Sequence, residues 1–267
     1  MPLILKSVAP AQGLRWLRDG VRLFLRHPLG FCSMFAAFLF VVMAGSLLPL
    51  VGPLLTLASL PLMSLGFMVA AEAATAGRPI HPGLFVSALR RDPTRTRSQI
   101  VLCVLYGALT IALMLWCDWI DAGAFDKLQR LMARAGAQEE IDALLAEPSF
   151  TTAMGLRLIG ATLISIPFWH ASALVHWGGQ PPAQALFSST LAVWRAKGAF
   201  AVYLLAWCSV IVGFGLLTAV VLSALGMSHL GGVVALPGAL TLSTIFYVSL
   251  IYPFNDSFDV RHTVVSA

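Results

Sequence analysis

Charged residues are scarce in this chain of 267 residues. Only 11% of them are Asp, Glu, Lys or Arg, whereas 58% are hydrophobic, and the mean hydropathy is +0.85. Soluble globular domains carry roughly 25% charged residues. A water-soluble fold of this length would lack the charge to cover its surface, so we expect lipid to solvate much of it.

Catalytic and metal-binding patterns are also missing from the sequence. It has no HExxH, GxSxG or GxxxxGK[ST] motif, and its four cysteines form no CxxC pair or zinc-like spacing. The signatures of zinc metalloproteases, α/β-hydrolases and P-loop enzymes are therefore excluded, and no disulfide framework is expected. We predict no enzymatic activity, no catalytic residues, no metal site and no cofactor.

Six long apolar runs dominate what is present. Each is long enough to cross a hydrocarbon core of about 30 Å as a helix. They cover about residues 29–50, 53–74, 99–116, 158–177, 199–222 and 232–252. The first run is too long for the apolar region of a cleavable signal peptide. The expected fold class is all-α, with residues 29–267 forming a polytopic membrane bundle of six transmembrane helices.

Residues 1–28 form an arm that precedes the first span, and residues 11–27 have helical periodicity. Two stripes follow this spacing: a basic stripe of Arg15, Arg18, Arg22 and Arg26, and an apolar stripe of Leu14, Leu17, Val21 and Phe24. Such a helix is expected to lie in the headgroup layer, with Trp16 at the lipid boundary. The alternative is an ordinary helix packed against other protein.

A short motif occurs twice, 102 positions apart, each time directly after an apolar run. The matched positions are Gly77/Gly179, Pro79/Pro181, Leu84/Leu186, Phe85/Phe187, Ser87/Ser189 and Leu89/Leu191. Each copy turns on Gly and Pro and continues as an amphipathic helix, over 82–91 or 182–197. Both copies are therefore expected on the same side of the membrane.

Basic residues are distributed unevenly between the connecting segments. Thirteen of the seventeen Lys and Arg residues lie in the arm, the second and fourth loops and the tail. The opposite side holds the acidic helical loop 118–152. By the positive-inside rule, both termini are expected in the cytoplasm of a bacterium, with the protein in the cytoplasmic (inner) membrane. This rule explains the basic charge, so no nucleic acid is expected as a partner.

Anionic lipid headgroups at the cytoplasmic face are the expected partners of the basic segments. The residues predicted to bind this membrane surface are Arg15, Arg18, Arg22, Arg26, Arg90 and Arg91. Other membrane proteins, or a second copy of this chain, are further candidate partners.

Ionisable residues within the spans are functional candidates because charge is costly in lipid. Glu72, near the end of the second span, is expected to pair with Arg78 or an arm arginine, or to form a proton or cation site. His170 follows Pro167 in the fourth span. It is expected to accept or donate a hydrogen bond at the proline kink, or to act as a ligand or proton relay. Asp118 and Arg157 lie at the same depth and are predicted to pair.

Three groups of residues together resemble a known group of proteins. They are Gly13, Trp16, Gly20, Phe24 and Pro28 before the first span, the repeated motif, and Tyr252, Asp256 and Phe258 in the tail. The pattern resembles a group of bacterial, mostly proteobacterial, six-span inner-membrane proteins of no established activity. That group is distantly like the membrane domain accompanying some glycerophosphodiester phosphodiesterases. The catalytic residues of those enzymes lie in a separate soluble domain, so none is carried over.

Together, these features favour a non-enzymatic scaffold or accessory protein of the membrane. The alternative is a small permease or channel-like transporter that uses Glu72 and His170.

The predicted threading can be tested with reporter tags at residue 130 and after residue 267. We expect the first tag to be labelled from outside intact cells and the second only after permeabilisation, because an even number of spans separates the tail from the arm. Labelling of both tags from the same side would contradict six spans.

Overall fold

The computed structural model describes residues 6–48, 51–90, 92–132, 138–227 and 230–258, and within them every regular element is a helix. The all-α fold class is thus confirmed. The helices are α1 (Gln12–Arg26), α2 (Pro28–Ser46), α3 (Val51–Thr75), α4 (Gly83–Leu89), α5 (Pro93–Ile120), α6 (Ala124–Met132), α7 (Gln138–Leu145), α8 (Pro148–Phe168), α9 (Ala171–Gly178), α10 (Pro182–Arg195), α11 (Lys197–Ala224), α12 (Gly231–Ser249) and α13 (Ile251–Ser257).

Six helical segments in the described residues are long and apolar enough to cross a membrane, as predicted. They are Pro28–Ser46, Leu54–Thr75, Pro93–Ile120, Pro148–Gly178, Lys197–Ala224 and Gly231–Ser257. The third and fourth segments begin earlier in the chain than the predicted spans. The third segment begins earlier than residue 99 because Asp92 caps α5, accepting a hydrogen bond from the Thr94 amide at 2.9 Å. Residues 148–152 belong to α8, with Pro148 in its first turn, and not to the acidic loop.

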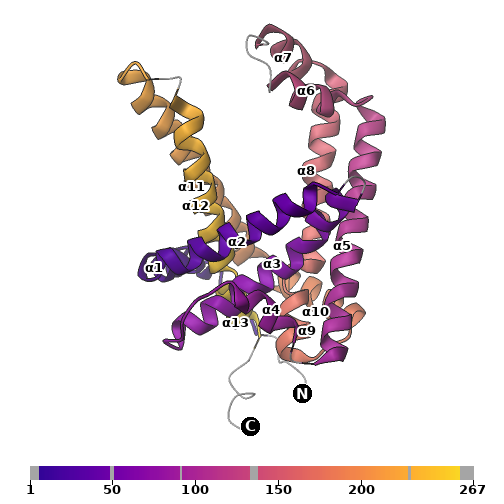
Figure 1. Cartoon of the computed structure of the whole chain (residues 1–267), viewed down its shortest axis with the longest axis vertical. Coiled ribbons are helices and arrows are strands. Elements are labelled where there is room, and N and C mark those ends of the chain that lie inside the picture. Colours follow the sequence, from indigo (N-terminus) through magenta and orange to yellow (C-terminus); the bar gives the residue numbers. More distant parts are fainter. Residues whose placement is uncertain (1–5, 49–50, 91, 133–137, 228–229, 259–267) are drawn as a thin grey trace.

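The short helices lie at opposite ends of the long ones. Figure 1 shows α4, α9, α10 and α13 near one end of the molecule, and α6 and α7, from the acidic loop, at the other. Both copies of the repeated motif are therefore at the same end. The α11–α12 pair leans away from the α5–α8 pair toward the end that carries α6 and α7 (Figure 1).

The fourth span is interrupted just after Pro167, where α8 ends at Phe168 and α9 begins at Ala171. Ser189, from the second motif copy, bridges the break. Its hydroxyl donates to the Ile166 carbonyl at 3.2 Å and accepts from the His170 backbone amide at 3.0 Å. A side chain from α10 thus satisfies backbone groups that the break leaves in an apolar setting.

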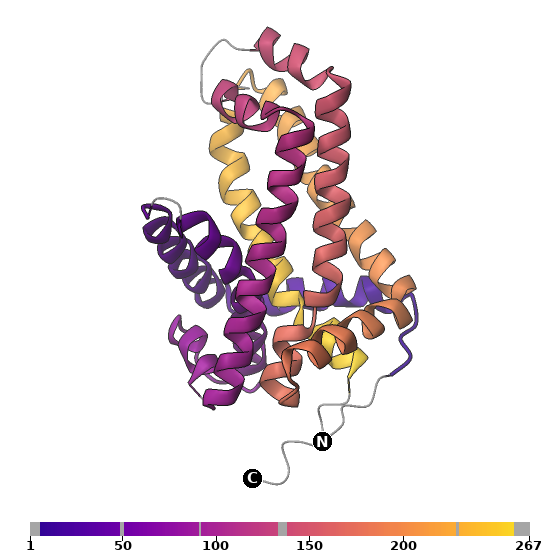
Figure 2. The same ribbon diagram turned by 90° about the vertical axis from the view of Figure 1, so that its right-hand side faces the viewer.

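Helix α1 packs against α11 and α12 and runs crosswise to the long helices (Figure 2). Its buried face consists of Gly13, Trp16, Gly20, Leu23 and Phe24. The Trp16 side chain is 1% exposed, and its indole Nε1 donates to Asp256 Oδ2 at 2.7 Å. The prediction that Trp16 lies at the lipid boundary was therefore wrong: its ring fills protein packing beside Phe200 and Tyr203.

Close approach of α1 to α11 depends on Gly13. A Cβ at this position would collide with the Ala199 carbonyl oxygen and lie 2.7 Å from the Tyr203 backbone nitrogen. Backbone atoms cannot move aside as the end of a side chain can. At Gly20, a Cβ would likewise collide with Ser249 of α12. Two glycines in one helical face thus bring α1 into backbone contact with both helices.

Replacing Gly13 with alanine is expected to destabilise the folded protein by about 1–3 kcal/mol, because the new methyl group forces α1 away from α11. Gly213→Ala in α11 is the matched control, since a Cβ there has no neighbour within 4 Å. This control should be neutral or slightly stabilising, because Ala favours helix over Gly. Thermal unfolding in detergent measures both variants, and equal midpoints would contradict the close contact.

Candidate functional site

The outward face of α1 carries the predicted basic stripe. Arg15, Arg18, Arg22 and Arg26 are all exposed, while the opposite face of the helix is buried against α11 and α12. Arg18 and Arg22 also lie near Asp19, with nitrogen–oxygen distances of 3.3 and 3.6 Å. Leu14 and Leu25 are 58% and 66% exposed on the same helix. The arm therefore presents cations and apolar side chains together, a combination suited to a headgroup layer.

A hollow of about 550 Å³ lies where the arm meets the first motif copy. It is lined by two short stretches, Arg26 to Gly30 and Gly77 to Ile80. Arg26, His27 and Arg78 make this hollow basic. The left-handed backbone of Gly77, with φ +69°, turns the chain after α3 and brings Arg78 to the hollow. Arg90 is exposed at the end of α4, and Arg91 lies outside the described residues.

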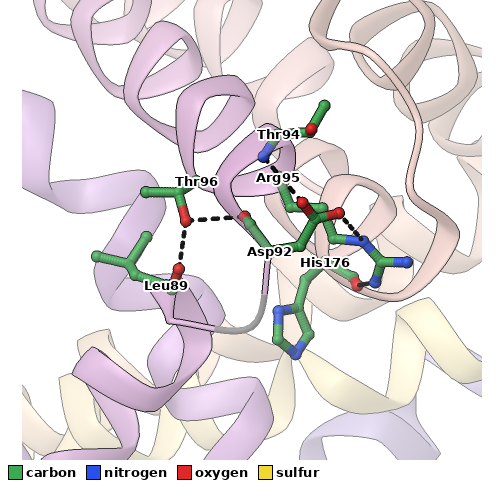
Figure 3. A network of polar contacts seen from close by, with 6 residues as sticks. All are labelled: Leu89, Asp92, Thr94, Arg95, Thr96 and His176. Carbon is green, nitrogen blue, oxygen red and sulfur yellow. Dashed lines mark hydrogen bonds and ion pairs between the residues drawn. The ribbon is translucent and has the colours of Figure 1, made fainter.

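A second group of polar residues joins α5 to the end of α9 (Figure 3). Arg95 Nη1 donates to the His176 carbonyl oxygen at 2.5 Å, and Arg95 Nε lies 3.6 Å from Asp92 Oδ2. The Thr96 hydroxyl contacts the Leu89 carbonyl and donates to the Asp92 carbonyl at 3.0 Å. Deeper along α5, Gln99 Nε2 donates to the Ser172 carbonyl at 2.6 Å. Arg95 thus connects the start of α5 with the end of α9.

His170 lies in close packing against aromatic side chains. Its side chain is fully buried, and rings of Phe200, Phe254 and Phe258 surround it at centroid distances of 5.7–5.8 Å. Neither imidazole nitrogen has a hydrogen-bond partner in the described part of the chain. The predicted bond from His170 to a carbonyl at the proline kink was wrong, since the backbone amide of His170 is bonded there through Ser189.

Glu72 is half-buried in the last turns of α3, and its carboxylate forms no ion pair with a described residue. The predicted pairing with Arg78 or an arm arginine is therefore absent from the described part of the structure. Among the described residues, no hydrogen bond or ion pair joins Glu72 to His170, and neither residue lines the basic hollow beside the arm.

The predicted pair of Asp118 and Arg157 lies at the opposite end, where α5 and α8 approach α6. Arg157 Nη2 is 2.5 Å from Asp118 Oδ1, and Arg157 Nη1 is 2.6 Å from Asp121 Oδ2. The guanidinium also lies 4.6 Å from the centre of the Phe125 ring. The Arg157 side chain is 12% exposed and that of Asp121 is fully buried, so this arginine is held against protein and does not extend outward.

Comparison with known proteins places the chain among membrane proteins. It is 32% identical over 259 residues to a probable inner membrane protein of Burkholderia thailandensis. The alignment covers 96% of this chain and 94% of that protein. The chain belongs to the family of this inner membrane protein. With six apolar helices in the described residues, it is an integral membrane protein.

The comparisons add no activity to this family. No family model matches the chain, and no solved structure matches it. They also give no support to the predicted link with the membrane domain of glycerophosphodiester phosphodiesterases. The matched relative is a probable inner membrane protein of nearly the same length as this chain.

The sequence analysis missed several residues that make long-range contacts in this structure. Asp121 was counted only as loop charge, although it follows Asp118 by three positions and shares a helix face with it. Asp256 and Ser189 were noted only as parts of motifs. Their partners, Trp16 and Ile166, are 240 and 23 positions away in the chain. No local spacing signals such contacts.

Asp121→Asn is expected to destabilise the protein more than Asp118→Asn, by about 1–3 kcal/mol against less than about 1 kcal/mol. The reason is that the Asp121 carboxylate is fully buried, whereas Asp118 is 37% exposed to screening solvent. Unfolding midpoints of the two single variants and the double variant measure the difference. A larger loss from Asp118→Asn would overturn this assignment.

Proposed function

We propose that this protein is a non-enzymatic scaffold or accessory component of a bacterial cytoplasmic membrane, with both termini on the cytoplasmic side. The observation that carries the proposal is the fixed position of the arm. Helix α1 is docked through Gly13, Gly20 and Trp16, which leaves its arginines exposed along the opposite face. A basic helix face held in a fixed position suits contact with anionic headgroups or with an acidic surface of another membrane protein.

Helix α10 supports an interfacial role for the same end of the molecule. Phe187, Leu191 and Trp194 follow helical spacing and are 69%, 39% and 69% exposed. Lys197 Nζ lies 5.1 Å from the Trp194 ring centre, so a cation and an aromatic ring stand together. Aromatic and basic side chains gather at the boundary between hydrocarbon and headgroups.

The transporter alternative receives less support from the geometry. A proton or cation pathway needs its ionisable groups beside water or another polar group. His170 is instead enclosed by phenylalanine rings, and no hydrogen bond or ion pair joins it to Glu72 among the described residues.

Removing two arm charges tests the headgroup contact. At about 1 kcal/mol per cation near an anionic surface, Arg15→Gln with Arg26→Gln should lower the preference for phosphatidylglycerol over phosphatidylcholine by about tenfold to thirtyfold. The full-length protein in mixed-lipid nanodiscs, with bound lipids counted by native mass spectrometry, provides the measurement. Neither arginine has a hydrogen bond or ion pair with a described residue, so the fold should be unaffected.

The matched control is Lys127→Gln with Arg130→Gln, which removes two charges from α6 at the opposite end. This control should leave the lipid preference unchanged, and equal losses in both doubles would contradict a specific arm surface. Cation or proton flux in proteoliposomes that disappears in Glu72→Gln would favour the transporter instead.

A further inference from the structure

An apolar groove runs along one side of the α11–α12 pair. Its volume is about 970 Å³, and leucine, isoleucine, alanine and aromatic side chains make up most of its wall. On α11 it extends from Leu204 to Leu222. The side of α11 away from α12 is largely exposed, in keeping with the outward lean of this pair in Figure 1.

A smaller cavity of about 140 Å³ adjoins the base of this groove, and Phe246 and Tyr247 line both. It lies among α3, α5, α8 and α12, and its wall includes Tyr106 and Trp169. Its walls contain polar groups, unlike most of the groove. Because Phe246 and Tyr247 line both spaces, the polar cavity lies next to one end of the apolar groove.

The polar end holds hydrogen-bonding groups without partners. The hydroxyls of Tyr106 and Tyr247 make no hydrogen bond in the described part of the chain, and Trp169 Nε1 is buried without a partner. In contrast, Ser64 and Ser165 in the same wall donate to carbonyls of their own helices, at 3.0 and 2.7 Å. In an apolar medium, a polar group without a hydrogen bond costs free energy. A ligand oxygen in this cavity would accept hydrogen bonds from these groups and remove that cost.

The depth of this cavity indicates the charge of the ligand. Tyr106 is thirteen residues from Pro93, the first residue of α5, which is about 20 Å along a helix. The cavity therefore lies within the span and away from the headgroup layer. Among the residues that the structure describes, no Lys, Arg, Asp or Glu lines it. A charged group would lack a counter-ion at this depth, so the site favours an uncharged ligand end.

The width of the groove indicates a hydrocarbon chain. Along the eighteen-residue rise from Leu204 to Leu222, about 27 Å, the volume of 970 Å³ gives a mean cross-section of about 36 Å². A long, narrow apolar groove of this kind suits an extended hydrocarbon chain lying between α11 and α12.

We propose that the α11–α12 groove and the cavity at Tyr106 and Tyr247 form one binding site for a neutral, diacylglycerol-like lipid. One hydrocarbon chain occupies the groove, and the tyrosine hydroxyls donate to a carbonyl or hydroxyl oxygen of the lipid. This site is distinct from the basic surface of the arm, which faces charged headgroups.

A photoactivatable diacylglycerol with a diazirine in one acyl chain tests the site, in nanodiscs holding the full-length protein. A phosphatidylglycerol with the same chain is the charged comparison. We expect the diacylglycerol probe to label peptides of α11 and α12 more strongly than the charged probe does. Unlabelled diacylglycerol should compete about fivefold less well in Tyr247→Phe, which loses one hydrogen bond and keeps the ring.

A matched pair of glycine variants localises the chain. Gly215 lines the groove and Gly213 does not, and a Cβ at either position has no neighbour within 4 Å. Gly215→Phe should block labelling, whereas Gly213→Phe should leave it unchanged. Equal effects of the two glycine variants, or equal labelling by both probes, would mean non-specific annular lipid and overturn the site. Crosslinks between two copies through α11 that Gly215→Phe abolishes would identify a second copy as the occupant and overturn it as well.

Discussion

The contact of α1 with α11 and α12 is the interaction on which the rest of this structure depends. It exists because Gly13 and Gly20 lack side chains where backbone and Ser249 approach them. Trp16 then reaches Asp256, which ties the first helix to the last across 240 positions. At the end away from α1, the α11–α12 pair leans away from α5 and α8 (Figure 1).

The cost of charge in lipid explains where the ionisable residues lie. Arg157 contacts two aspartates at one end of the long helices, and Arg95 contacts Asp92 and a carbonyl oxygen at the other. His170 differs from these, since its imidazole is fully buried and makes no hydrogen bond with a described residue. A neutral imidazole can pack against phenylalanine rings as an aromatic group, which is consistent with a structural role.

Local patterns predicted the parts of the fold that local physics controls. The six spans, the helix at 11–27 and the two motif helices follow from hydropathy, periodicity and the positions of Gly and Pro. The contact of Asp118 with Arg157 followed from equal depth in the membrane. Asp121, Ser189 and Arg95 were not assigned their contacts, because their partners lie 36, 23 and 81 positions away, where no periodicity applies.

The sequence by itself determined the membrane class, the number of spans and the end of the bundle at which the basic residues gather, because each depends on sums over neighbouring residues. Only the tertiary structure decided what the apolar face of α1 meets. Lipid tails and protein side chains are similarly apolar, so the same stripe of residues suits either surroundings. The match of Gly13 and Gly20 to the backbones of α11 and α12 favours protein packing, and shape of this kind arises only once the helices are assembled.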